Sequence, residues 1–459
     1  MKNGRILKLN LERFFFLLYN ISQYILSSKR GTKMKIAFYT LGCKVNQYES
    51  QAMAEAMEAK GFVTAAPNEE ADIYVINSCT VTAESDRKTR QTVRRYKKNH
   101  PDSMIVLTGC MSQAFPEDAE ALTEANIVLG NRNNHLLPVF IEKYLETRER
   151  IVSVQPHKTG DKFEGGIISG FERRTRAIVK IEDGCNRFCS YCIIPYARGR
   201  VRSKPLDVLE KELKSLSDAG FAEVVLVGIN LSAYGQDTGK NICDAVELAA
   251  GMDFERIRLG SLEPDHITDE VIERLSKIEK FCPQFHISLQ SGCDKTLKAM
   301  NRHYTADEYS ELCRKLRNAF NDTTLTTDIM VGFPDESEDD FRTSVEFAKA
   351  VGFEKVHVFP YSPREGTRAA KMNQLTRSVK EERSRIMIEE TEKVRQAFLK
   401  SQVGKIADVL FETNRADGYA EGYTMNYTPV KVQGEVRCSG IQKVKITAVD
   451  GDFCVGEIV

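Results

Sequence analysis

Three cysteines within eight residues are the part of this chain best suited to chemistry. Cys185, Cys189 and Cys192 lie in the segment GCNRFCSYC and follow the spacing C-x3-C-x2-C. Three thiolates held close together, with no fourth donor nearby, suit an iron–sulfur cluster in which one iron keeps an open coordination position. We therefore expect these cysteines to bind a cluster whose open iron can react.

Zinc binding and disulfide formation agree less well with the pattern. A structural zinc site needs four ligands, usually in pairs about two to four residues apart. The next Cys and His after Cys192 are Cys243 and His266. A chain of 459 residues with 12 Cys and no convincing secretory signal has the thiol usage of a reducing compartment, which predicts a cytoplasmic protein.

A second set of three cysteines is spread over the first part of the chain. The runs KIAFYTLGC, ADIYVINSC and MIVLTGC each predict a buried strand that ends at a cysteine: Cys43, Cys79 and Cys110. Helical patterns between these runs favour a parallel, flavodoxin-like sheet covered by helices. Any one of these cysteines alone would be a small buried side chain. Because parallel strands end at one edge, the three thiols are expected to converge and hold a second cluster.

The length of the chain predicts several domains, all of them α/β except the last. We expect the first domain at 34–145, a glycine-containing connector at 146–175, a second domain with a trailing helix at 176–402, and a small β-barrel of five strands at 403–459. Residues 1–33 are basic, and their apolar run is shorter than the roughly 20 residues of a membrane span. We expect no membrane anchor, and a native start at Met34.

Six strand-like runs alternate with helical patterns in the second domain, which predicts a partial, TIM-like barrel. The segment GCNRFCSYC follows the first run, on the face where such barrels bind their substrates. Polar residues at the ends of the later strands are expected to line the same cavity, where acids accept ribose hydroxyls and Arg302 pairs with a carboxylate. Each is also a residue that local backbone could satisfy. The candidates are Gly228, Asn230, Ser261, Glu263, Gln290, Arg302 and Asp328.

Two basic segments are candidates for phosphate contact, although the formal net charge of the chain is zero. Residues 87–98 carry seven basic side chains and no acid, and could equally be a solvated helix face. Arg198, Arg200 and Arg202 follow the three cysteines and could steer phosphates, or could simply be surface charge.

The segment GCNRFCSYC resembles the S-adenosylmethionine (SAM) binding signature of radical SAM enzymes. With GCKVNQYES, NSCT, TGC and LEPDHIT, the chain from Met34 to Val459 resembles the methylthiotransferases. The tail is similar to a TRAM domain, an RNA-binding module. Within the family, GCKVNQYES and EDGCNRFCSYCIIPYARG most resemble the branch that acts on threonylcarbamoyl-adenosine of tRNA, adjacent to the anticodon.

The resemblance implies two 4Fe–4S clusters and SAM. SAM would bind the open iron on the catalytic cysteines Cys185, Cys189 and Cys192, with Tyr191 near its adenine, and yield a deoxyadenosyl radical that takes hydrogen from carbon 2 of the target adenine. The other cluster would hold the sulfur to be inserted. The implied partners are tRNA, a reduced electron donor such as flavodoxin or ferredoxin, and a sulfur source.

Two alternatives to this function stay open from the sequence. One is the same chemistry on isopentenyl-adenosine of tRNA or on a ribosomal protein. The other is a non-catalytic iron–sulfur or zinc protein that binds RNA as an accessory factor.

Overall fold

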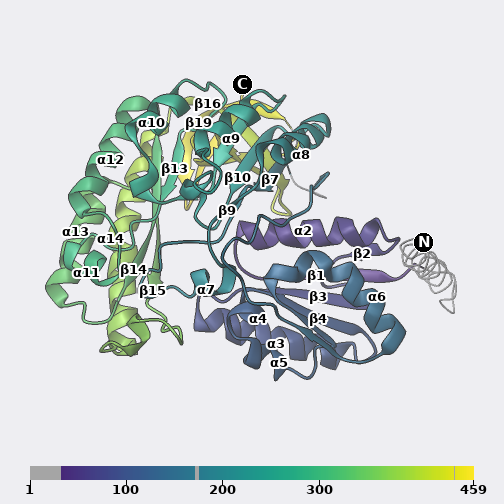
Figure 1. The fold of residues 1–459 in the computed structure, drawn as a ribbon. Coiled ribbons are helices and arrows are strands. Elements are labelled where there is room, and N and C mark those ends of the chain that lie inside the picture. The colour runs from purple at the N-terminus through teal and green to yellow at the C-terminus, as the bar shows by residue number, and fades with distance from the viewer. Residues whose placement is uncertain (1–32, 171–174, 439) are drawn as a thin grey trace. The chain divides into compact units, whose positions relative to one another are not determined.

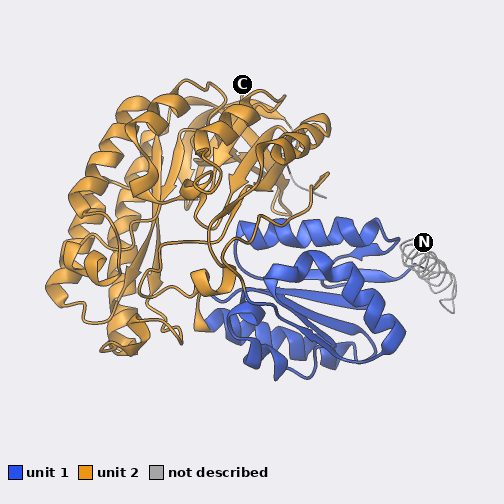
Figure 2. Ribbon diagram, in the orientation of Figure 1, with its two compact units in different colours: residues 1–80, 84–156 blue, residues 81–83, 157–459 orange. Residues whose placement is uncertain are grey.

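A computed structural model describes residues 33–170, 175–438 and 440–459. The expectations for residues 1–33 fall almost wholly outside the described residues. The chain divides into two compact units, residues 1–80 with 84–156 and residues 81–83 with 157–459 (Figure 2). None of the helices in the described ranges is long and apolar enough to cross a membrane.

Unit 1 is built on a parallel six-stranded sheet with the order β2-β1-β3-β4-β5-β6. The first five strands have the flavodoxin-like order, as the sequence predicts. The strands are β1 (Lys35–Thr40), β2 (Val63–Ala65), β3 (Ile73–Ser78), β4 (Met104–Gly109), β5 (Ile127–Leu129) and β6 (Ile151–Ser153).

Helices cover both faces of this sheet because its central strands are apolar on both sides (Figure 1). In β3, Ile73 and Val75 pack on one face and Tyr74 and Ile76 on the other. Helices α2 (Lys44–Glu58) and α6 (Leu137–Thr147) contribute to the first core. The second core includes residues of α3 (Ala83–Asn99), α4 (Cys110–Ala114) and α5 (Pro116–Glu120), and the 3-10 helix η1 (Asn131–Leu136) precedes α6.

The sheet of unit 1 continues past residue 145, the predicted end of the first domain. Strand β6 pairs in parallel with β5 and lies within the range expected to be a connector, 146–175. A three-residue strand is too short to give a periodic pattern, which is why the sequence showed only the glycines that follow it.

Unit 2 begins with an open barrel of parallel strands, which confirms the predicted partial barrel (Figure 1). The strands form two sheets, β11-β10-β7 and β12-β13-β14-β15, and a bridge from Ile257 to Phe281 links them. Across the described ranges, β7 and β15 remain edge strands. The strands are β7 (Arg176–Lys180), β10 (Glu223–Val227), β11 (Arg256–Leu259), β12 (Ser261–Leu262), β13 (Gln284–Ile287), β14 (Thr324–Val331) and β15 (Lys355–Pro360).

Amphipathic helices follow the barrel strands, and their start signals are the ones that the sequence predicts. Thr305 with Glu308, and Ser337 with Asp340, form capping boxes. The longer helices are α8 (Leu206–Asp218), α9 (Ile242–Ala250), α10 (Asp269–Ser276), α11 (Asp294–Ala299), α12 (Ala306–Ala319) and α13 (Glu338–Val351). Shorter elements at the strand ends are β8 (Glu182–Asp183), α7 (Ile194–Arg198), β9 (Arg202–Ser203), η2 (Leu231–Ala233) and η3 (Pro264–His266).

The tail forms a closed five-stranded barrel, as predicted, with the order β16-β17-β18-β20-β19. The long helix α14 (Arg377–Ser401), which follows η4 (Ala369–Lys371), leads into it, and Leu399 of α14 is part of the core of the small barrel. Its strands are β16 (Ile406–Asn414), β17 (Tyr419–Thr424), β18 (Pro429–Gln433), β19 (Ile441–Asp450) and β20 (Phe453–Ile458).

Candidate functional site

The strand-end cysteines, Cys43, Cys79 and Cys110, follow three adjacent strands of unit 1. Cys43 is the N-cap of α2, Cys79 directly follows β3, and Cys110 is the first residue of α4. Strand β3 pairs in parallel with β1 and with β4, and its pairing with β4 reaches the residues directly before Cys79 and Cys110. The structure therefore places these three thiols at one edge of the sheet.

Two glycines bring the ends of these strands into close contact. Gly42 has φ +101°, and a Cβ there would lie 2.9 Å from Cβ and 3.1 Å from Sγ of Cys79. Gly109 has φ +102°, and its Cβ would lie 2.5 Å from the backbone N and O of Ser78. Only glycine tolerates both the conformation and the lack of space, so each glycine holds the cysteine that follows it beside the neighbouring strand.

Two buried asparagines fix the same edge, and the sequence did not single them out. Asn46 Nδ2 donates to the backbone oxygens of Leu41 at 2.8 Å and of Ser78 at 2.9 Å. Asn77 Nδ2 donates to the backbone oxygen of Asn46 at 3.0 Å. These amides cross-link the segments that carry Cys43 and Cys79. Their presence inside KVNQYES and NSC was the signal that could have identified them.

The loop cysteines, Cys185, Cys189 and Cys192, lie between β8 and α7, after the first barrel strand. The backbone N–H of Cys185 donates to the oxygen of Gly199, and that of Cys192 to the oxygen of Cys189, both at 3.0 Å. Gly184 has φ +91°, and any side chain there would clash with a backbone oxygen of the turn between α7 and β9. A glycine with positive φ thus precedes the first loop cysteine, as it precedes Cys43 and Cys110.

The environment of the loop cysteines determines what they can bind. Burial raises the pKa of Cys185 to about 12 and raises the pKa of Cys192 further, and the charge of Cys189 adds to both shifts. Within the described residues, no group of three or more His, Cys, Asp or Glu side chains is placed to hold one metal ion. A 4Fe–4S cluster makes a different demand, because each thiolate binds its own iron. Three soft thiols on one short loop meet that demand.

Arg198 and Arg202 do not face solvent, which contradicts both roles considered for them, contact with phosphates and surface charge. Both are buried beside Asp183: Arg198 Nη1 lies 3.2 Å from Oδ1, and Arg202 Nη2 lies 3.2 Å from Oδ2. Lys180 Nζ lies 2.7 Å from Oδ2. Burial alone would raise the pKa of Asp183, but these three cations hold it well below its usual range. Their role is to brace the loop, whereas Arg200 is exposed and lies over the ring of Phe188 at 4.7 Å.

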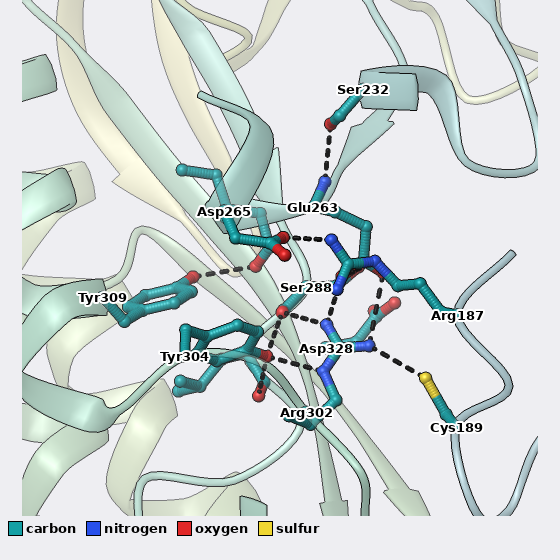
Figure 3. Close-up of polar contacts among 12 residues, drawn as sticks. Arg187, Cys189, Ser232, Glu263, Asp265, Ser288, Arg302, Tyr304, Tyr309 and Asp328 are labelled. Carbon is teal, nitrogen blue, oxygen red and sulfur yellow. Dashed lines mark hydrogen bonds and ion pairs between the residues drawn. The ribbon is translucent and has the colours of Figure 1, made fainter. Parts of the chain in front are cut away.

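Arg302 and Glu263 pair with each other in a buried network beside Cys189 (Figure 3). Arg187 joins this pair, since its Nε lies 3.4 Å from Glu263 Oε2 and its Nη2 pairs with Asp265. Arg302 was expected to pair with a ligand carboxylate and Glu263 to accept ribose hydroxyls. In the structure both side chains are engaged by other residues of the chain.

The other predicted cavity residues lie at several places, and Asp328, expected at the end of a strand, lies in the middle of β14 because that strand continues to Val331. Burial raises the pKa of Tyr191 well above its usual range, and its ring packs edge-on against Phe333 at 6.4 Å. Asp328 Oδ2 lies 3.3 Å from His286 Nε2. The backbone N–H of Gln290, which has φ +69°, donates to the backbone oxygen of Asp328 at 2.8 Å. Ser261 is exposed.

Glu182 is a buried acid that the sequence did not single out. Its Oε2 accepts from the backbone N–H of Asn230 at 2.7 Å, and a Cβ at Gly228 would lie 2.6 Å from the same oxygen. Burial raises the pKa of Glu182 well above its usual range. Gly228 and Asn230 therefore pack against this carboxyl group, which lies in β8 directly before the cysteine loop.

Two family models match separate parts of the chain. Residues 35–130 match the family described as uncharacterized protein family UPF0004, and residues 179–348 match the radical SAM superfamily. Among solved structures, the chain is similar in fold to the radical SAM methyltransferase TsrM of Kitasatospora setae, with a TM-score of 0.51, 14% identity, and coverage of 72% of this chain and 77% of that one. The match to the radical SAM superfamily, together with the relatives described next, assigns the chain to the radical SAM enzymes.

Curated relatives narrow the assignment. The chain is 36% identical to threonylcarbamoyladenosine tRNA methylthiotransferase MtaB of Bacillus subtilis, covering 92% of this chain and 96% of the relative. The protein of that name from Aquifex aeolicus is 37% identical, over 90% and 100%. A tRNA-2-methylthio-N(6)-dimethylallyladenosine synthase of Caldicellulosiruptor saccharolyticus is 32% identical, over 94% of each chain. The chain belongs to the methylthiotransferase family of radical SAM enzymes.

Proposed function

We propose that this chain adds a methylthio group to carbon 2 of N6-threonylcarbamoyladenosine, adjacent to the anticodon of tRNA. The observation that carries the proposal is the set of relatives with the corresponding name. Five of them are 31–37% identical to this chain and match at least 90% of it. Two sets of three cysteines, at the strand ends of two different sheets, are consistent with a reaction that needs both a radical and a sulfur carrier.

The strand-end cysteines would hold one 4Fe–4S cluster and the loop cysteines a second, with SAM beside the loop. When bound, these groups supply the radical that takes hydrogen from the substrate carbon, and the sulfur and methyl group to be inserted. Support for this assignment comes from the three thiols at each place and from the glycine that positions the first cysteine of each set.

The residues of the chain bind, orient and exclude water in this proposal. Gly42 and Gly109 hold the strand-end cysteines at one edge. Tyr191 packs with Phe333 against an apolar core cluster, and this packing would limit the access of water to that side of the loop. The three cations around Asp183 keep the loop in place. We expect a cytoplasmic location, a reduced electron donor such as flavodoxin or ferredoxin, and a separate sulfur source.

Contact with tRNA would involve the TRAM-like barrel and the basic face of α3. Arg87, Lys88 and Arg94 of α3 are 53%, 58% and 61% exposed. Some of this charge is compensated, since Arg87 pairs with Glu84 and Arg94 lies 3.3 Å from Glu124. Exposed basic side chains on one helix fit the phosphates of RNA, and binding through them releases counterions.

The double variant Lys88→Gln, Arg94→Gln should bind tRNA more weakly than the wild type, and its affinity should depend less on salt concentration. Two lost phosphate contacts reduce the slope of log K against log salt by about 1.4 to 1.8. Filter binding of one tRNA at several salt concentrations measures the slope. The matched control replaces Arg385 and Lys393 of α14, which are both 61% exposed. An equal change in the two double variants would argue against contact through α3.

Nucleoside analysis tests the proposed function directly. Transfer RNA from cells that lack this protein should retain N6-threonylcarbamoyladenosine and lose its 2-methylthio derivative. Re-expression of the chain should restore the derivative. Unchanged levels of the derivative would reject the proposal.

A second candidate substrate is dimethylallyladenosine, the isopentenyl-type adenosine of tRNA. Three relatives named as synthases of its methylthio derivative are 32% identical to this chain. Loss of that derivative in the same nucleoside analysis, with the threonylcarbamoyl derivative unchanged, would select this alternative.

A further inference from the structure

The turn that follows α11 clamps the loop that carries the loop cysteines. The backbone N–H of Ser190 donates to the oxygen of Met300 at 2.9 Å, and Ser190 Oγ donates to the oxygen of Ala299 at 2.8 Å. Asn301, which has φ +62°, donates from Nδ2 to the backbone oxygen of Phe188 at 3.3 Å. Arg302 comes next in the chain and reaches a cysteine.

All five N–H groups of Arg302 have acceptors, and its side chain is only 2% exposed. Nε donates to Tyr304 Oη at 2.9 Å. One N–H of Nη1 points to Cys189 Sγ at 3.4 Å and the other to Glu263 Oε1 at 3.3 Å. Nη2 donates to Glu263 Oε2 and, at 3.1 Å, to the oxygen of Ser288. No donor is left for a ligand carboxylate.

The position of Arg302 is held from both sides. Tyr304 Oη lies 2.8 Å from the backbone oxygen of Ser288 and 2.7 Å from that of Leu289, and these two acceptors share its one O–H, which anchors the tyrosine to the end of β13 (Figure 3). On the other side, the backbone N–H of Glu263 donates to Ser232 Oγ at 2.7 Å, which holds in place the residue whose carboxylate pairs with Arg302. The guanidinium therefore cannot turn away from Cys189 without breaking a buried network.

We propose that Arg302 is a positioning residue for Cys189, whose thiolate it contacts through Nη1, and that it sets the reduction potential of the cluster on the loop cysteines. The proposal rests on the proposed function, which assigns a cluster to these cysteines. A hydrogen bond to a ligating sulfur and a nearby fixed charge are two of the properties that set such potentials.

The sign of the effect follows from charge. Reduction adds one electron, delivered by a reduced flavodoxin or ferredoxin, and makes the cluster more negative by one unit. The Arg302 cation and its N–H stabilise the reduced state more than the oxidised state, and the Glu263 carboxylate does the reverse. Together the two side chains are nearly neutral, so that removing either one alone shifts the potential in a predictable direction.

Arg302→Gln should move the midpoint potential of the cluster to more negative values, and Glu263→Gln should move it to more positive values. Redox titration with dithionite and mediators, followed by electron paramagnetic resonance of the anaerobically reconstituted full chain, measures both shifts. Arg302→Lys, which keeps the charge, should shift the potential less than Arg302→Gln. If the glutamine variant loses its iron, the lysine variant is used to measure the shift instead.

Tyr309→Phe is the matched control for general loosening of the barrel. Its buried hydroxyl donates to the backbone oxygen of Ile287 at 2.8 Å and carries no charge, so the potential should stay at the wild-type value. Two results would overturn the proposed role of Arg302 and leave the proposed function standing. One is a shift of the same sign in the Arg302 and Glu263 variants, and the other is an unchanged potential in variants that keep the wild-type iron content. A wild-type protein without a reducible cluster would overturn the proposed function as well.

Discussion

Replacing Cys189 with alanine is expected to abolish cleavage of SAM, whereas Cys79→Ala should spare part of that cleavage and stop sulfur insertion. The reason is that the two thiol sets belong to different units: Cys189 lies on a loop of the barrel of unit 2, and Cys79 lies at the strand-end edge of the sheet of unit 1. A missing thiolate at one place removes a ligand from that cluster only. Chromatography of deoxyadenosine and of methylthio-nucleosides measures the two activities separately.

Iron content decides how these activities are interpreted. The reconstituted wild-type chain should contain about eight irons, and each cysteine variant about four, if each set of thiols holds one 4Fe–4S cluster. Cys243→Ala is the control, because this buried thiol donates only to the backbone oxygen of Val271 and should leave the iron content unchanged. Equal loss of both activities in the Cys79 and Cys189 variants, with intact folding, would contradict two separate roles.

The sheet edge that carries the strand-end cysteines could be predicted because its pattern is local. Cys79 and Cys110 directly follow the fully buried strands β3 and β4, Cys43 comes three residues after the end of the partly buried β1, and parallel strands bring their carboxyl ends to one edge. The glycine before the cysteine was also visible, since the pair Gly-Cys occurs at Gly42, Gly109, Gly184 and Gly292. The first three glycines have positive φ and stand in turns that no other residue allows, whereas Gly292 has no positive φ and precedes a buried thiol outside both sets.

Pairing between distant side chains could not be predicted from the sequence. Glu263 and Arg302 are 39 positions apart, and Asp183 and Arg198 are 15 apart. A pattern of strands and helices places all four near one barrel end but does not say which charges are buried. For this reason the arginines were assigned to ligands and phosphates, whereas burial requires each of them to have a partner within the chain.

The opposite end of the barrel carries a buried ion pair that joins it to the small β-barrel. Arg258 Nε and Nη2 lie 2.9 and 3.2 Å from the two carboxylate oxygens of Glu223, and Nη2 also donates to the backbone oxygen of Met425 at 3.1 Å. Arg256 donates to the backbone oxygen of Asp408 at 2.7 Å. Glu223 is the first residue of β10, so the contact lies at the amino ends of the barrel strands, where residues act in stability.

Arg258→Leu should therefore destabilise unit 2 by about 3 to 5 kcal/mol, because it leaves the Glu223 carboxylate buried with a weaker partner. Urea unfolding followed by circular dichroism at one pH measures the loss. The double variant Arg258→Leu, Glu223→Leu should recover most of it, since the buried carboxylate is then absent and Arg176, which lies 3.7 Å from it, keeps its ion pair with Glu412. The control Arg385→Leu lies on the exposed face of α14 and should change the stability by no more than about 0.5 kcal/mol.

The same pair predicts how stability depends on pH. Burial alone would raise the pKa of Glu223, but the guanidinium groups of Arg258, Arg176 and Arg256 together outweigh burial and lower the pKa below its usual value. A carboxyl group with a lowered pKa in the folded state stabilises the fold above its unfolded pKa of about 4.3, and this contribution is lost as pH falls through the folded value. The difference in stability between wild type and the double variant should shrink over that range. A constant difference down to low pH would show that packing, and not the ion pair, joins the two barrels.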